Sequence, residues 1–182
     1  MYIFIDLDGV LVEFAKTAIK KHNKYVHPNE IVWDIPTQIG FDSIASPDFW
    51  NPLDYDFWAN LPWTTEGKEI YEQTINHYGK DKCFVLTAPA ASKGCIDGKA
   101  HWIKNNLDIP YLMTNSKHVV AEGNLLIDDR NENYDSFIKH GGKCVLVPRP
   151  WNKLKHESNE NADVSDIQKL IFNIKSYSAI RP

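Results

Sequence analysis

Short apolar runs recur along this chain, and a polar residue follows each of them. The clearest runs cover 2–5, 83–86, 124–127 and 143–147, and a weaker one covers 111–113. They are apolar at nearly every position rather than at alternate positions, which predicts strands buried on both faces, as in a parallel sheet. Segments with helical spacing of apolar residues lie between them, at 66–78, 98–106 and 133–140. Because strands alternate with helices, we predict a doubly wound α/β fold.

One long segment interrupts this alternation. Far more residues separate the first run from the second than a crossover helix requires. Helical spacing covers 14–25, and the prolines beyond it restrict later helices to short pieces. The segment is rich in aromatic residues, most of which would form its own core. We therefore predict a catalytic core of residues 1–14 and 65–182. A small, mainly helical cap of residues 15–64 would be inserted after the first strand, over the carboxyl edge of the sheet.

A last helix is predicted near the carboxyl end of the chain, over 166–177. Its apolar residues have core-facing spacing and are Ile167, Leu170, Ile171 and Ile174. Ser165 precedes this pattern, and serine is a favoured N-cap residue because its hydroxyl accepts a hydrogen bond from a backbone N–H of the first turn. We expect the helix to begin immediately after Ser165.

The charge of the chain argues against some classes of partner. The 182 residues have a net charge of −4, whereas proteins that bind duplex nucleic acid usually present a concentrated basic surface. The longest lysine cluster has helical spacing and is explained as a solvated helix face: Lys16, Lys20, Lys21 and Lys24. An anionic ligand must therefore be held by a few local groups. No apolar stretch approaches the roughly 18 residues of a membrane span, so we expect no membrane partner.

The cysteines and the amino terminus bear on the compartment. Cys83, Cys95 and Cys144 show no metal-ligand spacing, and their odd number argues against a disulfide framework. Cys83 and Cys144 open apolar runs, and we interpret them as buried free thiols. The amino terminus enters a strand pattern directly and lacks the features of a secretory signal. We expect a cytoplasmic protein. The oligomeric state is open, with a homodimer among the alternatives.

Polar residues of related chemistry follow the predicted strands. In chain order they are Asp6, Thr87, Thr114 with Lys117 just beyond it, and Asp128 with Asp129. Because ligands of a parallel sheet bind beyond the carboxyl ends of its strands, these side chains should converge on one rim. Each carboxylate alone could be explained as a turn former. Their joint placement favours a functional site.

Such a rim offers the groups that phosphoryl transfer needs. Carboxylate oxygens suit Mg²⁺, which prefers octahedral oxygen coordination and usually shares its shell with substrate phosphate. A carboxylate beside the metal ion can attack phosphorus and form an aspartyl-phosphate. A lysine and a threonine hydroxyl can hold the non-bridging oxygens. A second carboxylate two residues on can protonate the leaving oxygen and then activate water.

Four motifs occur in order along the chain: IFIDLDGVLVEF, FVLTAP, TNSKH and LLIDDR. Together they span 3–130 and resemble the motifs of the haloacid dehalogenase (HAD) superfamily. In that superfamily the second aspartate of the first motif, here Asp8, indicates a phosphatase or a phosphomutase. More narrowly, DLDGVLVEF, the TxP of the second motif, LLIDDR and the downstream VPRPWNK resemble the 5'(3')-deoxyribonucleotidase family. Bacterial and phage-type members of that family carry a similar PWN.

The resemblance implies a role for each carboxylate. By this resemblance Asp6 is the nucleophile and Asp8 is the general acid and base. Mg²⁺ would be bound by the Asp6 carboxylate, the Asp8 backbone carbonyl and the Asp129 carboxylate. Asp128 would support these ligands or order a metal-bound water.

The same resemblance implies the phosphate site. Thr87 and Lys117 would hold the phosphate, with help from backbone N–H groups near Asp8 and Ala88. The family often has serine where this chain has Ala88, so a backbone donor remains at this position and a hydroxyl donor is lost. An ordered water can substitute for such a donor.

The predicted function is Mg²⁺-dependent hydrolysis of a (deoxy)nucleoside monophosphate through an aspartyl-phosphate intermediate. Phe14 matches an aromatic position that contacts the base in the family, and Trp50 of the cap is a second candidate for stacking. Two alternatives stay open. A phosphatase of a sugar phosphate or another small metabolite would need a cap with more hydrogen-bonding side chains. A non-catalytic nucleotide- or partner-binding domain would have no need of both Asp6 and Asp8.

Overall fold

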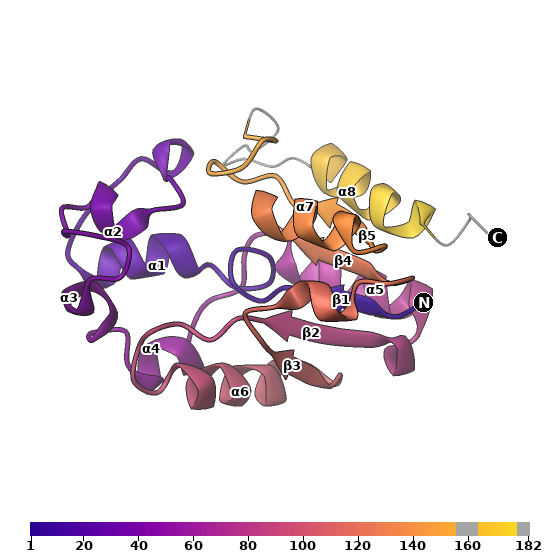
Figure 1. The fold of residues 1–182 in the computed structure, drawn as a ribbon, viewed down its shortest axis with the longest axis horizontal. Helices are drawn as coiled ribbons and strands as arrows, with labels where there is room; N and C mark the ends of the chain where they lie inside the picture. The colour runs from indigo at the N-terminus through magenta and orange to yellow at the C-terminus, as the bar shows by residue number, and fades with distance from the viewer. Residues whose placement is uncertain (156–163, 178–182) are drawn as a thin grey trace.

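The chain folds around a five-stranded, all-parallel sheet with the strand order β3-β2-β1-β4-β5 (Figure 1). The structure is a computed structural model, and it describes residues 1–155 and 164–177. Its strands are β1 (Ile3–Ile5), β2 (Cys83–Thr87), β3 (Tyr111–Met113), β4 (Leu125–Asp128) and β5 (Lys143–Leu146). All five apolar runs of the sequence are therefore strands.

The strength of each sequence pattern follows the burial of its strand. β4 lies inside the sheet and is buried at all four positions. β3 lies at an edge, and Leu112 at its centre is 41% exposed. An edge strand needs fewer apolar side chains than a strand covered on both faces, so its pattern is the weakest in the sequence.

Helices cover both faces of the sheet. One hydrophobic cluster joins alternate strand residues such as Ile3 and Ile5 to α5 (Gly67–Tyr78), α6 (Cys95–Asn106) and α8 (Val164–Ser176). The other joins Phe4 and Leu126 to α7 (Asn131–Lys139) and the short helix η3 (Lys117–Val120). Successive strand residues point to opposite faces, so β1 contributes to both clusters. The predicted doubly wound α/β fold is confirmed.

Two helices begin earlier than their apolar spacing indicated. α6 begins at Cys95 rather than at residue 98, and α7 begins at Asn131 rather than at residue 133. The first turn of α7 is polar and only partly buried, so it leaves no apolar periodicity to detect. The sequence therefore predicts which face of a helix is buried better than it predicts the residue at which the helix begins.

The last helix also begins early. α8 already includes Val164, so Ser165 lies inside it and the prediction that Ser165 is its N-cap is wrong. Leu170, Ile171 and Ile174 are buried, as their spacing predicted. The side chain of Ile167 lies outside the described part of the chain.

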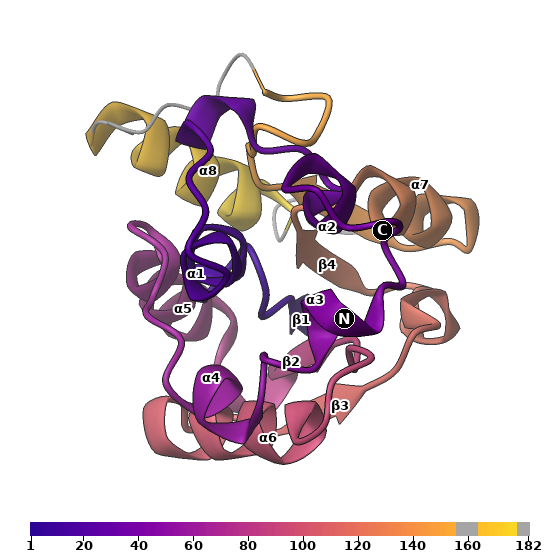
Figure 2. The ribbon, with the colours of Figure 1, turned by 90° about the vertical axis from the view of Figure 1, so that its left-hand side faces the viewer.

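The segment between β1 and α5 consists of short helices. These are α1 (Phe14–Lys21), η1 (Pro28–Glu30), α2 (Ile35–Gln38), α3 (Pro47–Trp50) and α4 (Tyr55–Ala59). A further short helix, η2 (Lys80–Lys82), lies outside this segment and follows α5. α1 ends at Lys21, four residues before the predicted end at residue 25. Figures 1 and 2 show α1, α2 and α3 beyond the carboxyl ends of the strands. We name residues 15–64 the cap segment and propose that they form a cap over the core.

The end of the cap segment is packed tightly against the core. A Cβ atom added to Gly98 of α6 would lie 2.6 Å from Cβ of Trp58 and 2.8 Å from the backbone oxygen of Tyr55, both in α4. The indole N–H of Trp102 in α6 donates a hydrogen bond to the backbone oxygen of Leu61 at 2.7 Å. These contacts fix α4 to the flank of the sheet.

Exposure to solvent differs between the clustered lysines and the cysteines. The lysines of the helical cluster, Lys16, Lys20, Lys21 and Lys24, are exposed as expected. The cysteines are free and buried, and burial raises the pKa of the Cys83 thiol to about 11. Across residues 1–155 and 164–177, no helix has the length and apolar character that a membrane crossing requires.

Candidate active site

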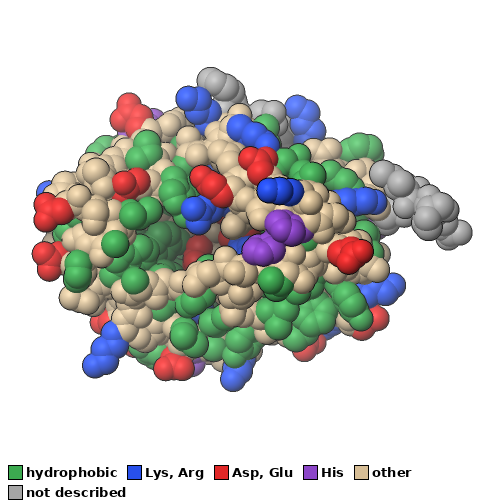
Figure 3. All heavy atoms as spheres, viewed as in Figure 1, with side chains coloured by type: hydrophobic (Ala, Val, Ile, Leu, Met, Phe, Trp, Pro, Cys, Tyr) green, Lys and Arg blue, Asp and Glu red, His purple; other side chains and the backbone are tan. Residues whose placement is uncertain are grey.

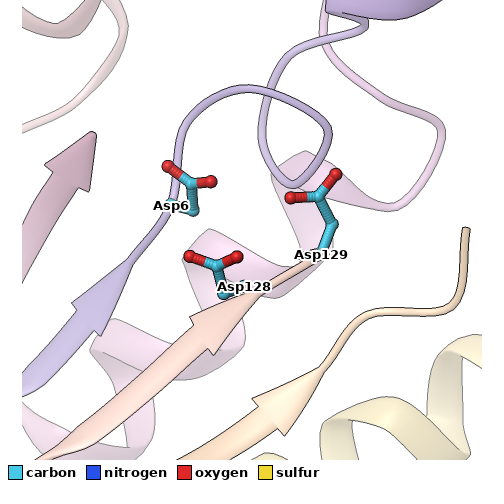
Figure 4. Close-up of side chains that lie close together, drawn as sticks. All are labelled: Asp6, Asp128 and Asp129. Carbon is cyan, nitrogen blue, oxygen red and sulfur yellow. The ribbon is translucent and has the colours of Figure 1, made fainter. Parts of the chain in front are cut away.

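The carboxyl ends of the two central strands bring three carboxylates together. Asp6 follows β1, Asp128 is the last residue of β4, and Asp129 comes next. Ile5 pairs with Ile127 across the two strands, which places their ends side by side. One carboxylate oxygen from each aspartate lies within 4.8 Å of the other two, and all three residues are buried (Figure 4). Two of them, Asp6 and Asp129, were predicted as ligands of a metal ion, whereas Asp128 was expected to support the ligands.

Lys117 is the cation of this cluster. Its Nζ lies 2.7 Å from the carboxylate of Asp6 and 2.7 Å from that of Asp128. Burial alone would lower the pKa of Lys117, but the charges of Asp128 and Asp6 outweigh burial and raise that pKa above its usual value. The ammonium therefore stays protonated.

Asp128 is held by a complete set of donors. Besides Lys117, it accepts a hydrogen bond from the backbone N–H of Arg130 at 2.9 Å. The side-chain amide of Asn133 lies 3.1 Å from each of its two oxygens. Asp128 thus positions Lys117 at the rim, in agreement with a supporting role.

The carboxylates of Asp6 and Asp129 also have partners, but burial and the neighbouring carboxylates still raise the pKa of each. Burial raises the pKa of Asp6 to about 7; Lys117 lowers that pKa, and the charges of Asp128 and Asp8 raise it. Burial also raises the pKa of Asp129 well above its ordinary value, and Asp128 and Asp6 add to the rise. A hard divalent cation between these oxygens would offset their repulsion, so the donor set fits such an ion.

Asp8 is paired with a lysine that the sequence analysis missed. The fully buried Nζ of Lys99 forms an ion pair with Asp8 and donates a hydrogen bond to the backbone oxygen of Ala88 at 2.6 Å. It also lies 3.2 Å from Oγ1 of Thr87 and 4.8 Å from the centre of the Trp58 ring. Lys99 thus connects the first and second motifs of the site.

One signal for Lys99 is present in the sequence. Lys99 lies three and four residues before Trp102 and Ile103, on the face of α6 that is buried. A lysine in that register must either extend to the surface or find a buried partner. The register does not name the partner, because Asp8 is 91 residues away in the sequence.

The hydroxyl groups of the two predicted threonines, Thr87 and Thr114, form hydrogen bonds within the protein. Thr87 is fully buried, and its hydroxyl faces Lys99 rather than the cavity described below. Thr114 stabilises a turn, since its hydroxyl accepts a hydrogen bond from the backbone N–H of Ser116 at 3.0 Å. The predicted phosphate-site residues Ala88 and Lys117 do line the cavity.

A tight loop after β1 brings Asp8 to the rim. The backbone oxygen of Leu7 accepts hydrogen bonds from the N–H groups of Leu11 and Val12, both at 2.9 Å. Gly9 has a φ of +77°, and a Cβ atom at this position would lie 2.2 Å from Oδ2 of Asp129. Glycine is therefore required here by its backbone angle and by the close approach of Asp129.

A cavity of about 380 Å³ opens onto these groups. Its lining includes Asp6, Asp8 and Asp129 from the rim and apolar residues from the cap segment. Figure 3 shows hydrophobic side chains around a hollow on the cap side of the molecule. A small phosphorylated ligand could place its phosphate among the charges and its remaining part among the apolar groups.

Both residues predicted to contact a base are in the wall of this cavity. The ring of Phe14 stacks on Trp50, with centroids 6.3 Å apart and planes at 12°. It also stacks on Trp58, at 5.2 Å and 7°. A third tryptophan of the lining, Trp33, has the guanidinium of Arg130 4.4 Å from its ring centre. The cap segment therefore contributes an aromatic wall.

The family comparison identifies the class of protein. Residues 1–177 match the family model described as 5' nucleotidase, deoxy (pyrimidine), cytosolic type C protein (NT5C). The chain belongs to this family. It is therefore a HAD-like phosphoric monoester hydrolase, and the resemblance found in its motifs is confirmed. No curated protein sequence matches the chain.

Solved structures give weaker likenesses to this nucleotidase-family chain. A phosphonoacetaldehyde hydrolase-like protein from Oleispira antarctica is 10% identical with a TM-score of 0.47, covering 97% of this chain and 83% of that one. A HAD family enzyme from Bacteroides thetaiotaomicron, in complex with magnesium and inorganic phosphate as an Asp-to-Ala mutant, is 14% identical with a TM-score of 0.43, covering 87% of this chain and 98% of that one. The family assignment does not depend on them.

Proposed function

We propose that the protein hydrolyses a (deoxy)nucleoside monophosphate, with Asp6 as the nucleophile and Asp8 as the general acid and base. The observation that supports this most is that the buried Asp6 carboxylate lines the same cavity as a group of aromatic side chains. A nucleobase suits such a wall because its faces stack on aromatic rings. A sugar phosphate would leave the same wall without matching hydrogen-bond partners.

The metal ion in this proposal is Mg²⁺. Asp6, Asp129 and the backbone carbonyl of Asp8 would hold it. Their oxygen donors and the mutual repulsion of the buried carboxylates both suit a hard cation. When bound, the ion offsets the negative charge of the carboxylates and of the substrate phosphate. Asp128 stays with Lys117 in this arrangement.

The chain's own residues account for both chemical steps. An oxygen of Asp6 bonds to phosphorus while the ester P–O bond breaks, and Asp8 gives its proton to the leaving oxygen. Asp8 then takes a proton from water, and the water oxygen attacks the aspartyl-phosphate. Inorganic phosphate leaves, and the Asp6 carboxylate is restored. The second Asp8 oxygen, Oδ1, has no hydrogen-bond partner within the described residues and is the atom proposed for these proton transfers.

Positive charge and backbone donors would hold the phosphate. Lys117, already 2.7 Å from Asp6, would neutralise a non-bridging oxygen of the group under attack. The backbone N–H groups near Asp8 and Ala88 would donate to the others. The hydroxyl of Thr87 contacts Lys99 and does not line the cavity. A direct contact with the phosphate would require this side chain to turn when substrate binds.

A substrate screen tests the proposal. Purified protein with Mg²⁺ is assayed on all common ribo- and deoxyribonucleoside monophosphates and on sugar phosphates of similar size. We expect the highest kcat/KM on a nucleotide. A higher kcat/KM on sugar phosphates would contradict the proposed substrate. Binding of nucleotides without any turnover by folded protein would contradict the catalytic role itself.

We also propose a cytoplasmic location, which the cytosolic type named by the matching family supports. A small phosphate monoester is the expected partner. A homodimer stays a prediction that sedimentation or light scattering of the purified protein would test.

A further inference from the structure

The PRPWN segment, residues 148–152, lies against the site but has no role in the chemistry above. It follows β5 and returns to the rim, where it contacts both Gly9 and Asp129. Nε of Arg149 donates a hydrogen bond to the backbone oxygen of Gly9 at 2.6 Å, and its Nη1 lies 2.5 Å from the carboxylate of Glu66. The segment therefore holds the loop that carries Asp8.

The same segment fixes Asp129 at two points. The side-chain amide of Asn152 donates to the backbone oxygen of Asp129 at 2.8 Å and to that of Val147 at 2.7 Å. The indole N–H of Trp151 donates to the carboxylate oxygen Oδ2 of Asp129 at 2.9 Å. Asp129 is only 2% exposed, so water does not compete freely with this bond.

The surroundings of the two Asp129 oxygens are consequently unequal. Oδ2 has the indole N–H as a partner and lies close to the backbone of Gly9, where a methyl group added to that glycine would be only 2.2 Å away. Trp151 packs on the same glycine, since that methyl group would be 3.2 Å from its Cζ2. Oδ1 has neither of these contacts.

The geometry points to Trp151 as the residue that makes Asp129 a one-oxygen ligand and so favours Mg²⁺ over Ca²⁺. Mg²⁺ takes about six oxygens in near-octahedral geometry, whereas Ca²⁺ takes about six to eight and accepts both oxygens of one carboxylate. An Oδ2 that is already hydrogen-bonded and closely packed disfavours the second mode. Trp151 is a positioning residue in this inference, which rests on the metal site of the proposed function.

Metal binding to the whole protein tests the inference without an activity assay. The Kd values of Mg²⁺ and Ca²⁺ are measured by calorimetry for the wild type and for Trp151→Phe, which keeps an aromatic ring and loses the N–H. We expect Mg²⁺ binding to weaken by about 10- to 100-fold, the range typical of lost partners of metal ligands, while Ca²⁺ binding changes by less than about threefold. Trp63→Phe, outside the cavity lining, is the matched control and should change neither value.

The possible failures are distinguishable. The Trp151→Phe variant must melt at the same temperature as the control. The role of Trp151 would then be overturned if the binding of Mg²⁺ and of Ca²⁺ weakened equally, or if neither Kd changed. Asp129→Asn separates this result from a failure of the proposed metal site. If the wild type binds Mg²⁺ no better than Asp129→Asn does, the metal site itself is wrong and the inference falls with it.

Discussion

Two buried lysines organise the charged residues of the site. Lys117 lies between Asp6 and Asp128, and Lys99 is paired with Asp8. Each proposed catalytic carboxylate is thus next to an ammonium that is buried away from water. Breaking such a buried pair leaves an uncompensated charge, so substitutions of either lysine affect the carboxylates more than the packing.

Asp6→Asn should abolish turnover and leave the fold intact. Asparagine has nearly the same size as aspartate, but its amide cannot attack phosphorus effectively. Hydrolysis of p-nitrophenyl phosphate with Mg²⁺ measures the loss, and a thermal melt shows whether the variant is folded. Near-normal turnover by a folded variant would rule out Asp6 as the nucleophile.

Lys99→Met should lower kcat by misplacing Asp8. Methionine fills the space of the lysine stem, but it cannot hold the Asp8 carboxylate. General acid–base catalysis typically contributes about 10²- to 10⁴-fold, and we expect part of that factor to be lost, mainly on substrates with poor leaving groups. Lys104→Met, exposed on the same helix, is the matched control. Equal losses on good and poor leaving groups would argue against a role through Asp8.

Phe14→Ala tests whether the aromatic wall binds a base. Stacking of a base on an aromatic side chain is worth about 1–3 kcal/mol, so the KM for nucleoside monophosphates should rise about ten- to a hundredfold. The KM for glycerol phosphate, which has no base, should hardly change. The opposing possibility is that Phe14 serves only to pack Trp50 and Trp58. In that case the turnover of both substrates would decrease equally, and the melting temperature of the variant would fall.

Among the elements, helix α6 both positions Lys99 and packs against α4. One face carries Lys99 to the rim, and Gly98 beside it allows α4 to approach closely. The position of Lys99 therefore depends on a contact between the core and the end of the cap segment. Any movement of the cap segment should involve α1 to α3 rather than α4.

Gly98→Ala should destabilise the protein although alanine is the better helix former. In an open helix position the change would stabilise by about 0.4–1 kcal/mol. Here the new methyl group would lie 2.6 Å from Cβ of Trp58, and such overpacking typically costs about 1–3 kcal/mol. Urea denaturation measures the free energy of unfolding, with Lys104→Ala on the exposed face as control. A more stable Gly98→Ala variant would contradict the close packing of α4 on α6.

At the scale of the whole molecule, the rim concentrates negative charge where the fold buries it. The folded-state pKa of Asp6 is raised from 3.8 to about 7, so between these values the folded state binds more protons than the unfolded state. The free energy of unfolding should therefore decrease as pH rises from about 4 to about 7, as the linkage relation requires. Asp129, whose pKa is also raised, acts in the same direction.

This pH dependence should appear in chelator and be reduced by Mg²⁺. Urea denaturation at several pH values, in chelator, should give a steeper decline for the wild type than for Asp6→Asn, which cannot ionise at this position. Saturating Mg²⁺ should recover most of the lost stability above pH 7, because an ion that binds only the folded state stabilises it. Parallel declines in wild type and variant would show that Asp6 does not carry the effect.

Hydrophobic patterning alone predicts the strands of the sheet and the carboxylates at its rim. Runs that are apolar at nearly every position indicate buried parallel strands, and the residue after such a run is expected at the carboxyl edge of the sheet. Asp6, Asp128 and Asp129 were therefore found without any tertiary information, and the structure brings them within 4.8 Å. The helix faces followed in the same way from their periodicity, whereas polar first turns left the helix starts unmarked.

Residues that are far apart in the sequence meet through tertiary packing, which the local pattern does not predict. Lys99 contacts Asp8 across 91 positions, and Trp151 contacts Asp129 across 22. Periodicity shows that a side chain faces inward, but the packing of α4, α6 and the segment after β5 selects the atom it reaches. The cavity has the same origin, because its walls come from the cap segment and from the strand ends together. Local pattern fixes the direction of each side chain, and the packing of distant elements fixes its partner.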